Sequence, residues 1–189
     1  MKKVAGIMIA KGESTRLHKK NQRIFCNRPL YEWNLEKLIN IGIDVYFESD
    51  NEIMLEKAKE MGAHTILRPP ELRGHNVPSV PLFQNIVANM PYTPDAVINI
   101  QANSPNTSKE LLFRAVKILQ TIDCTEILTF YPDLRINGSL WGFSYKGLMN
   151  YQDPYVHNPD ILLLDNAIDI HLETEFEKAE ELFKQENNI

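Results

Sequence analysis

Short apolar runs alternate with longer amphipathic stretches along the whole chain. The first run, Val4 to Ala10, is apolar without interruption, which is typical of a strand buried on both faces at the centre of a parallel sheet. Later runs are bounded by turn-forming or charged residues, as strands usually are. We therefore expect further strands at residues 44–48, 64–68, 96–100, 126–131 and 138–144.

The stretches between these runs have helical periodicity. We expect helices from about Pro29, over residues 52–61 and 81–90, from Ser108, and over a last segment that ends near Gln185. The last helix would begin with a capping box in which Thr174 and Glu177 are the two partners. This order of elements predicts an α/β fold, a single Rossmann-like three-layer domain over residues 1–189 with a mostly parallel central sheet.

A loop is expected between residues 69 and 81, where the chain has four prolines and little periodicity. Loops of that length in compact domains are usually functional or disordered. Pro69 and Pro70 would close the preceding strand and stiffen the start of the loop.

Composition excludes several classes of protein. A chain of 189 residues is long enough for one α/β domain with a sizeable core. The formal net charge of −5 argues against a general nucleic-acid or membrane-surface binder. Cys26 and Cys124 form no C-x-x-C pair, and we expect both thiols to be reduced. No apolar run reaches the roughly 18 residues of a membrane span and no signal peptide is recognisable, so we expect a soluble, cytoplasmic protein.

Candidate chemistry begins directly after the first strand. The residues from Lys11 to Asn21 form a short basic segment with one glycine, Gly12. In open α/β sheets, ligands bind beyond the carboxyl ends of the strands, and such a loop can offer backbone N–H groups and cations to a polyphosphate. The segment contains neither G-x-x-x-x-G-K nor G-x-G-x-x-G, so it is neither a P-loop nor a dinucleotide fingerprint.

Residues 10–21 read Ala-Lys-Gly-Glu-Ser-Thr-Arg-Leu-His-Lys-Lys-Asn. This segment resembles the A-R-G-G-S-K-R-[IL]-P-x-K-N signature of the CMP-sugar synthetases, which are the acylneuraminate and Kdo cytidylyltransferases. Residues 25–30, Phe-Cys-Asn-Arg-Pro-Leu, are similar to the L-x-G-[KR]-P-L that follows in that family. The resemblance implies a fold of the nucleotide-diphospho-sugar transferase type.

Four further blocks resemble the family in the same order along the chain. Residues 68–72 are similar to its R-P-x-E-L, and residues 101–105 to its Q-x-[TD]-[SE]-P. Residues 137–141 resemble N-G-[AS]-[IL]-Y, and residues 167–180 resemble S-I-D-I-D-T-x-x-D-F-x-x-A-E. Because the blocks span nearly the whole chain in order, together they are far more specific than any one of them.

The resemblance implies transfer of CMP from CTP to a small acidic sugar, with release of pyrophosphate and with Mg²⁺ as cofactor. The resemblance also implies that Arg68 and the loop around Asn76 and Ser79 recognise the cytosine base, and that Asp169 binds Mg²⁺. The residues that it assigns to nucleotide binding are Ala10, Gly12, Ser14, Arg16, Asn21, Arg68, Asn76 and Ser79. Those that it assigns to catalysis are Lys11, Lys20, Gln101 and Asp169.

Several positions depart from the family pattern. Lys11 replaces an arginine and keeps a single cation without the bidentate fork. Glu13 replaces a glycine and would repel a triphosphate if it pointed inward, and Thr15 replaces a lysine. The family presents two aspartates, two residues apart on a strand, to the metal. Here Asp169 is followed by His171, and imidazole is a poor ligand for Mg²⁺.

The segment between the helix that follows Ser104-Pro105 and the block at Asn137-Gly138 is also short. Residues 124–136 hold barely one strand and a turn, where the family carries a long insertion that dimerises and helps hold the sugar. A monomer and a homodimer therefore both remain open, as does a smaller acceptor such as a phosphonate or a polyol phosphate. Two further alternatives are a homologue that binds nucleotide without turnover and an enzyme that uses GTP or UTP instead.

Overall fold

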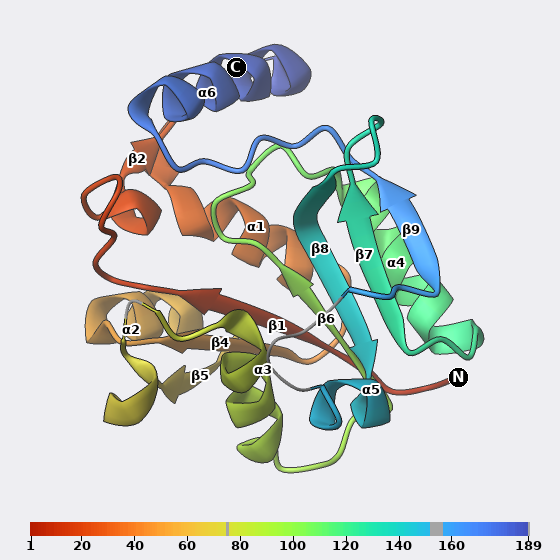
Figure 1. Cartoon of the computed structure of the whole chain (residues 1–189). Coiled ribbons are helices and arrows are strands. Elements are labelled where there is room, and N and C mark those ends of the chain that lie inside the picture. Colours follow the sequence, from red (N-terminus) through yellow and green to blue (C-terminus); the bar gives the residue numbers. More distant parts are fainter. Residues whose placement is uncertain (75, 152–156, 189) are drawn as a thin grey trace.

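The computed structural model describes residues 1–74, 76–151 and 157–188. Its centre is a seven-stranded sheet with the order β5-β4-β1-β6-β8-β7-β9 (Figure 1). β8 runs antiparallel to both of its neighbours, and the other pairs are parallel, so the predicted mostly parallel sheet is confirmed. The strands are β1 (Val4–Ala10), β4 (Val45–Ser49), β5 (His64–Leu67), β6 (Ala96–Ile100), β7 (Glu126–Phe130), β8 (Ile136–Ser144) and β9 (Ile161–Leu164).

Helices cover both faces of this sheet and give the expected three layers (Figure 1). One face packs against α1 (Leu30–Ile39), α2 (Glu52–Glu60) and α4 (Lys109–Thr121). The other face packs against α3 (Ser79–Ala88) and α5 (Tyr145–Met149).

The side chains of β1 pack against the helices on both faces of the sheet and so connect the three layers. Met8 lies in the core on the α1 side and Ile7 in the core on the α3 side, because successive strand residues point to opposite faces. Complete burial of each such side chain stabilises the fold by about 1.5–3 kcal/mol. Gly6 lets α1 approach closely, since a Cβ atom there would lie 2.8 Å from the Leu38 side chain.

A third, smaller core lies beside the sheet. The helix α6 (Glu173–Asn187) packs on a short hairpin made by β2 (Ile24–Phe25) and β3 (Arg28–Pro29). The ring of Phe25 meets those of Phe176 and Phe183 edge to face, with centroids 5.4 Å apart in both pairs. Ile170 is buried in the same core and therefore fixes the segment before α6 against the body of the protein.

Three of the helix boundaries follow the expected chemistry. Ser108 precedes α4 and accepts a hydrogen bond from the Leu111 N–H at 3.0 Å. Asn51 caps α2 in the same way, and Gly62 follows that helix with φ of 106°, a conformation that glycine adopts without strain.

The expected start of α6 was wrong. Thr174 lies inside the helix, which begins at Glu173 after Leu172. The carboxylate that reaches back belongs to Glu175, and it accepts the N–H groups of His171 at 2.7 Å and Leu172 at 2.8 Å. A carboxylate three residues after the N-cap position satisfies these amides without a Ser or Thr cap.

Other boundaries also differ from expectation. The helix expected over 81–90 begins two residues earlier, and the loop before it contains the short 3-10 helix η2 (Pro70–Leu72). The sequence patterns predicted neither β9, α5, the hairpin nor the 3-10 helix η1 (Lys20–Gln22). Residues 166–170 form no strand and belong to the connection between β9 and α6. Among the described residues, no helix is long and apolar enough to cross a membrane.

Candidate active site

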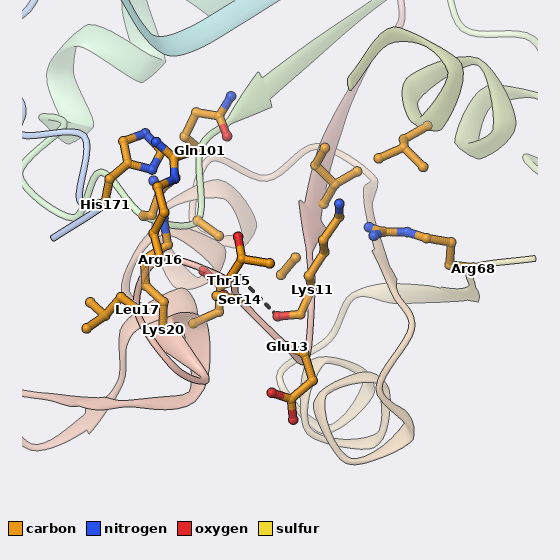
Figure 2. A pocket seen from close by; sticks show the side chains of 16 residues that line it. Lys11, Glu13, Ser14, Thr15, Arg16, Leu17, Lys20, Arg68, Gln101 and His171 are labelled. Atoms are coloured by element: carbon orange, nitrogen blue, oxygen red, sulfur yellow. Dashed lines mark hydrogen bonds between the residues drawn. The ribbon is translucent and has the colours of Figure 1, made fainter. Parts of the chain in front are cut away.

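A cavity of about 280 Å³ opens at the carboxyl ends of β1 and β6 (Figure 2). The predicted site residues that line it are Ala10, Lys11, Ser14, Arg16, Lys20, Asn21, Arg68 and Gln101. Ile9, Glu13, Thr15, Leu17, Leu82, Ala102, Asn103 and His171 complete the lining. Four other predicted residues, Gly12, Asn76, Ser79 and Asp169, are not among the lining residues. The structure therefore gathers segments far apart in the sequence into one site.

The charges on the lining favour an anion. Lys11, Arg16, Lys20 and Arg68 all border the cavity. Burial lowers the pKa of Lys20 to about 8, although the nearby Asp169 carboxylate acts in the opposite direction. The pKa of Lys11 is also lowered, first by burial and then by the charge of Arg68. Cations that shift in this way are stabilised when a polyanion binds beside them.

Arg68 is fully buried, although arginine is almost always exposed. Its Nε donates a hydrogen bond to Oε1 of the equally buried Glu48 at 2.8 Å. Its two terminal nitrogens are buried and have no hydrogen-bond partner among the described residues. Figure 2 shows the nitrogen ends of Arg68 and Lys11 facing each other in the cavity. These unpartnered donors therefore indicate a ligand that accepts hydrogen bonds at this position.

The loop after β1 is held in place by its own neighbours. Asn21 donates a hydrogen bond to the Lys11 carbonyl at 3.0 Å, and Gln22 donates one to the Gly12 carbonyl at 2.8 Å. The N–H of Gly12 donates to Asp50 at 2.7 Å, so this amide is engaged within the protein. Asn21 thus braces the loop through its side chain while it also lines the cavity.

Glu13 is turned away from the cationic end of the cavity. Its carboxylate lies 3.6 Å from Nδ1 of His18, and it points away from Lys11 and Arg68 in Figure 2. The repulsion that an inward-pointing Glu13 would exert on a triphosphate is therefore reduced in this conformation.

The turn that carries Gln101 is fixed by α1. The side-chain amide of the buried Asn34 donates hydrogen bonds to the carbonyls of Gln101 at 2.8 Å and Ser104 at 2.7 Å. Lys37, one helical turn further on, donates to the carbonyls of Pro105 and Thr107. The carbonyls of Gln101 and Ser104 also accept the N–H groups of Ser104 at 3.4 Å and Thr107 at 3.1 Å, so the side chains of α1 add a second set of hydrogen bonds to this turn.

Asp169 lies just behind the lining residues Asn103 and His171. Its Oδ1 accepts a hydrogen bond from Asn103 Nδ2 at 2.5 Å, and its Oδ2 accepts one from His171 Nε2 at 2.8 Å. Burial acts to raise the pKa of Asp169, but the hydrogen bond and charge of His171 and the charge of Lys20 outweigh it and hold the pKa below its usual range. The carboxylate is therefore ionised at neutral pH.

A metal ion at this site would have one carboxylate ligand, that of Asp169. Among the described residues, no group of three or more His, Cys, Asp or Glu side chains is arranged to hold a metal ion. A carboxylate offers about four lone-pair sites, and the two hydrogen bonds to Asp169 occupy two of them. Mg²⁺ in nucleotide enzymes is commonly held by one or two carboxylates together with the substrate phosphates. Asp169 fits the arrangement with one carboxylate.

Sequence reasoning missed several residues that build the site: Asn34, Lys37, Glu48, Asn85 and Asn103. Glu48 carried a signal, because a charge inside an otherwise apolar strand needs a buried partner. The polar residues of α1 carried none, since a helix that packs on a sheet normally has polar positions facing solvent.

The fold and the cavity define the class of protein. A mostly parallel α/β sheet with a cationic cavity at the carboxyl ends of its central strands is typical of proteins that bind nucleotides. A sequence model of the cytidylyltransferase family matches residues 5–133. The chain belongs to this family, as the motifs predicted.

Individual relatives agree with this assignment. The chain is 30% identical over 115 residues to the pseudaminic acid cytidylyltransferase of Campylobacter jejuni subsp. jejuni serotype O:2. That match covers 58% of this chain and 50% of the relative, so the chain spans about half the length of the curated relative that it matches.

Solved structures show the same fold. The structure of CMP:2-keto-3-deoxy-manno-octonic acid synthetase in complex with CTP superposes with a TM-score of 0.76 at 13% identity, over 97% of this chain and 99% of that one. Rv0371C of Mycobacterium tuberculosis H37Rv, in a complex with manganese, superposes with a TM-score of 0.69 at 12% identity, over 95% and 98% of the two chains.

Proposed function

We propose that this chain transfers CMP from CTP to a small acidic sugar of the sialate, nonulosonate or Kdo type and releases pyrophosphate. The observation that carries the proposal is the cavity with four basic side chains, one of which is a buried arginine whose two terminal nitrogens have no hydrogen-bond partner among the described residues. Membership of the cytidylyltransferase family supports CTP as the donor. The name of the Campylobacter relative, which acts on pseudaminic acid, supports an acidic sugar as the acceptor.

In this reaction an oxygen of the acceptor attacks the α-phosphorus of CTP. A bond forms between the two atoms, the bond from the α-phosphorus to the bridging oxygen breaks, and pyrophosphate leaves. The acceptor hydroxyl loses its proton to solvent. Lys11, Arg16 and Lys20 would neutralise the phosphate charge, with Ser14 as a further donor. Gln101, on the turn fixed by α1, would place the acceptor.

Arg68 would select the base. Cytosine presents O2 and N3 as adjacent acceptors in the base plane, and the two terminal nitrogens of a guanidinium match such a pair. Uracil presents an N–H at position 3, which would face an arginine donor. The backbone around Asn76 and Ser79 would contribute the remaining contacts of the base, as the family resemblance implies.

Mg²⁺ would enter with the nucleotide, held by Asp169 and the phosphates, and it would neutralise charge that develops on the phosphate oxygens. Use of a divalent metal is supported by the manganese complex of the Mycobacterium neighbour. Asn103 and His171 would orient the carboxylate through its two oxygens. A cytoplasmic location and a monomeric or homodimeric state remain predictions.

A thermal-shift series with CTP, UTP, GTP and ATP, each with and without Mg²⁺, tests donor choice. A ligand at 100 times its dissociation constant stabilises a protein by about 2.7 kcal/mol. We expect CTP to raise the melting temperature most, and more so with Mg²⁺. Pyrophosphate release with pseudaminate, N-acetylneuraminate, Kdo and a polyol phosphate then identifies the acceptor. Stabilisation by GTP or UTP alone would contradict the proposal.

A second candidate is a nucleotide-binding protein without turnover. It is favoured by the engagement of the Gly12 amide with Asp50 and by the presence of one carboxylate where the family pattern has two. Stabilisation by CTP without pyrophosphate release from any acceptor would favour it over the enzyme.

A further inference from the structure

Three side chains from different elements form a buried network behind the cavity. Glu48 lies near the end of β4, Arg68 follows β5, and Asn85 lies on α3. Glu48 Oε1 accepts a hydrogen bond from Arg68 Nε at 2.8 Å, and Glu48 Oε2 accepts one from Asn85 Nδ2 at 2.9 Å. Glu48 and Arg68 have no exposed surface, and Asn85 is half-buried.

The network fixes the orientation of the guanidinium. Arg68 uses its Nε edge for Glu48, which leaves its two terminal nitrogens as the remaining donors. The carboxylate of Glu48 is itself held at its second oxygen by Asn85, so it cannot rotate without loss of a hydrogen bond. Arg68 therefore presents its terminal nitrogens to the cavity from one defined position.

We infer that Glu48 and Asn85 are positioning residues that set base selectivity by fixing the plane of Arg68, an inference that rests on the proposed use of CTP. A guanidinium that can rotate finds acceptors on either pyrimidine, because both carry O2. A fixed guanidinium meets O2 and N3 of cytosine together and meets a donor at position 3 of uracil. Unpaired buried donors of this kind give the largest discrimination between similar ligands.

Stability alone does not explain the network. A buried ion pair often stabilises a protein no more than apolar residues of similar size, because two charges must leave water. Tyr46 and Phe47, the two residues before Glu48 in the strand, are hydrophobic and buried, so an apolar residue would suit this position. The carboxylate and the amide are accounted for by the orientation of Arg68.

The decisive experiment measures the dissociation constants of CTP and UTP for the wild type and for Asn85→Ala by titration calorimetry. We expect the UTP-to-CTP ratio of dissociation constants to fall about tenfold in Asn85→Ala, which corresponds to about 1.4 kcal/mol. Gln84→Ala is the matched control, because Gln84 is adjacent on α3 and donates to the carbonyls of Leu148 and Tyr151 instead. Its ratio should equal that of the wild type.

Glu48→Gln is the second variant. It keeps the shape of the side chain and removes its charge, and it should also lower the ratio. If Glu48→Gln does not fold, Asn85→Ala decides alone. A wild type that prefers CTP while the variants keep the same ratio would overturn the inference and leave the proposed function intact. A wild type that binds no nucleotide, or binds CTP and UTP equally, would overturn both.

Discussion

The side-chain amide of Asn34 lies 2.8 Å from the carbonyl oxygen of Gln101, which places a fully buried helix residue directly under the turn that lines the cavity. The same amide reaches the carbonyl of Ser104, and its oxygen accepts a hydrogen bond from Lys37. Gln101 is therefore positioned by α1 as well as by the strand that precedes it.

Asn34→Ala should destabilise the protein and impair turnover more than nucleotide binding. The substitution removes one hydrogen bond from each of two carbonyls, which keep the N–H groups of Ser104 and Thr107 as donors. Each lost bond costs about 0.5–1.5 kcal/mol. We expect urea denaturation to show this loss, kcat to fall, and the CTP dissociation constant to change little. Asn40→Ala, at the exposed end of the same helix, is the control and should be neutral. Equal losses in CTP affinity and kcat would contradict the assignment.

Lys37 predicts a specific pH dependence of stability. Burial lowers the pKa of Lys37 to about 8 in the folded protein, although Asp165 and Glu186 oppose the shift. The unfolded chain has the ordinary lysine pKa of about 10.4, so between these values the unfolded state binds more protons. The contribution of Lys37 to the free energy of unfolding therefore rises as the pH increases from about 8 to about 10.4, by at most about 1.4 kcal/mol per pH unit.

Denaturation at several pH values tests this sign. The difference in unfolding free energy between the wild type and Lys37→Met isolates the lysine, because the buried Lys20 titrates in both proteins. We expect that difference to shift in favour of the wild type as the pH rises. A difference that stays constant from pH 7 to 10.5 would show that the Lys37 pKa is unchanged on folding.

The centre of the sheet was predictable because its pattern is local. An uninterrupted apolar run such as Val4–Ala10 has few alternatives to a central strand, and the structure places it between β4 and β6. The run Ile161–Leu164 was not recognised, because four consecutive apolar residues show no alternation even though two of them point outward at the sheet edge.

The site was only partly predictable because its supports are distant in sequence. The motifs identified Lys11, Arg68 and Gln101 as neighbours, and all three line the cavity. The pairing of Glu48 with Arg68 depends on the register between β4 and β5, and its pairing with Asn85 depends on the packing of α3, which no local pattern encodes. Side chains that support a site are therefore found from the structure rather than from motifs.

Asp169→Asn should lower kcat by about a hundredfold while it leaves CTP affinity nearly unchanged. Asparagine keeps the size of the side chain but carries no charge, so an electrostatic interaction that matters in the transition state is lost. Steady-state kinetics with saturating CTP and CTP titrations without acceptor separate the two effects. Asp133→Asn, in the exposed turn beside Arg135, is the control. Unchanged kcat in Asp169→Asn would remove Asp169 from the catalytic residues.

Gly12→Ala should displace the loop after β1. A Cβ atom at this position would lie 2.8 Å from Cβ of Asn51, the residue that caps α2, so the loop or the helix must move. Overpacking of this kind costs about 1–3 kcal/mol, and the shifted loop carries Lys11 and Ser14 out of register with a bound triphosphate. We expect both lower stability in urea and a higher CTP dissociation constant. Gly42→Ala is a matched control, because Gly42 has φ of 80° with open space around it, so the substitution strains the backbone far from the cavity. If Gly12→Ala loses stability as Gly42→Ala does but binds CTP as tightly as the wild type, the position of this loop does not govern nucleotide binding.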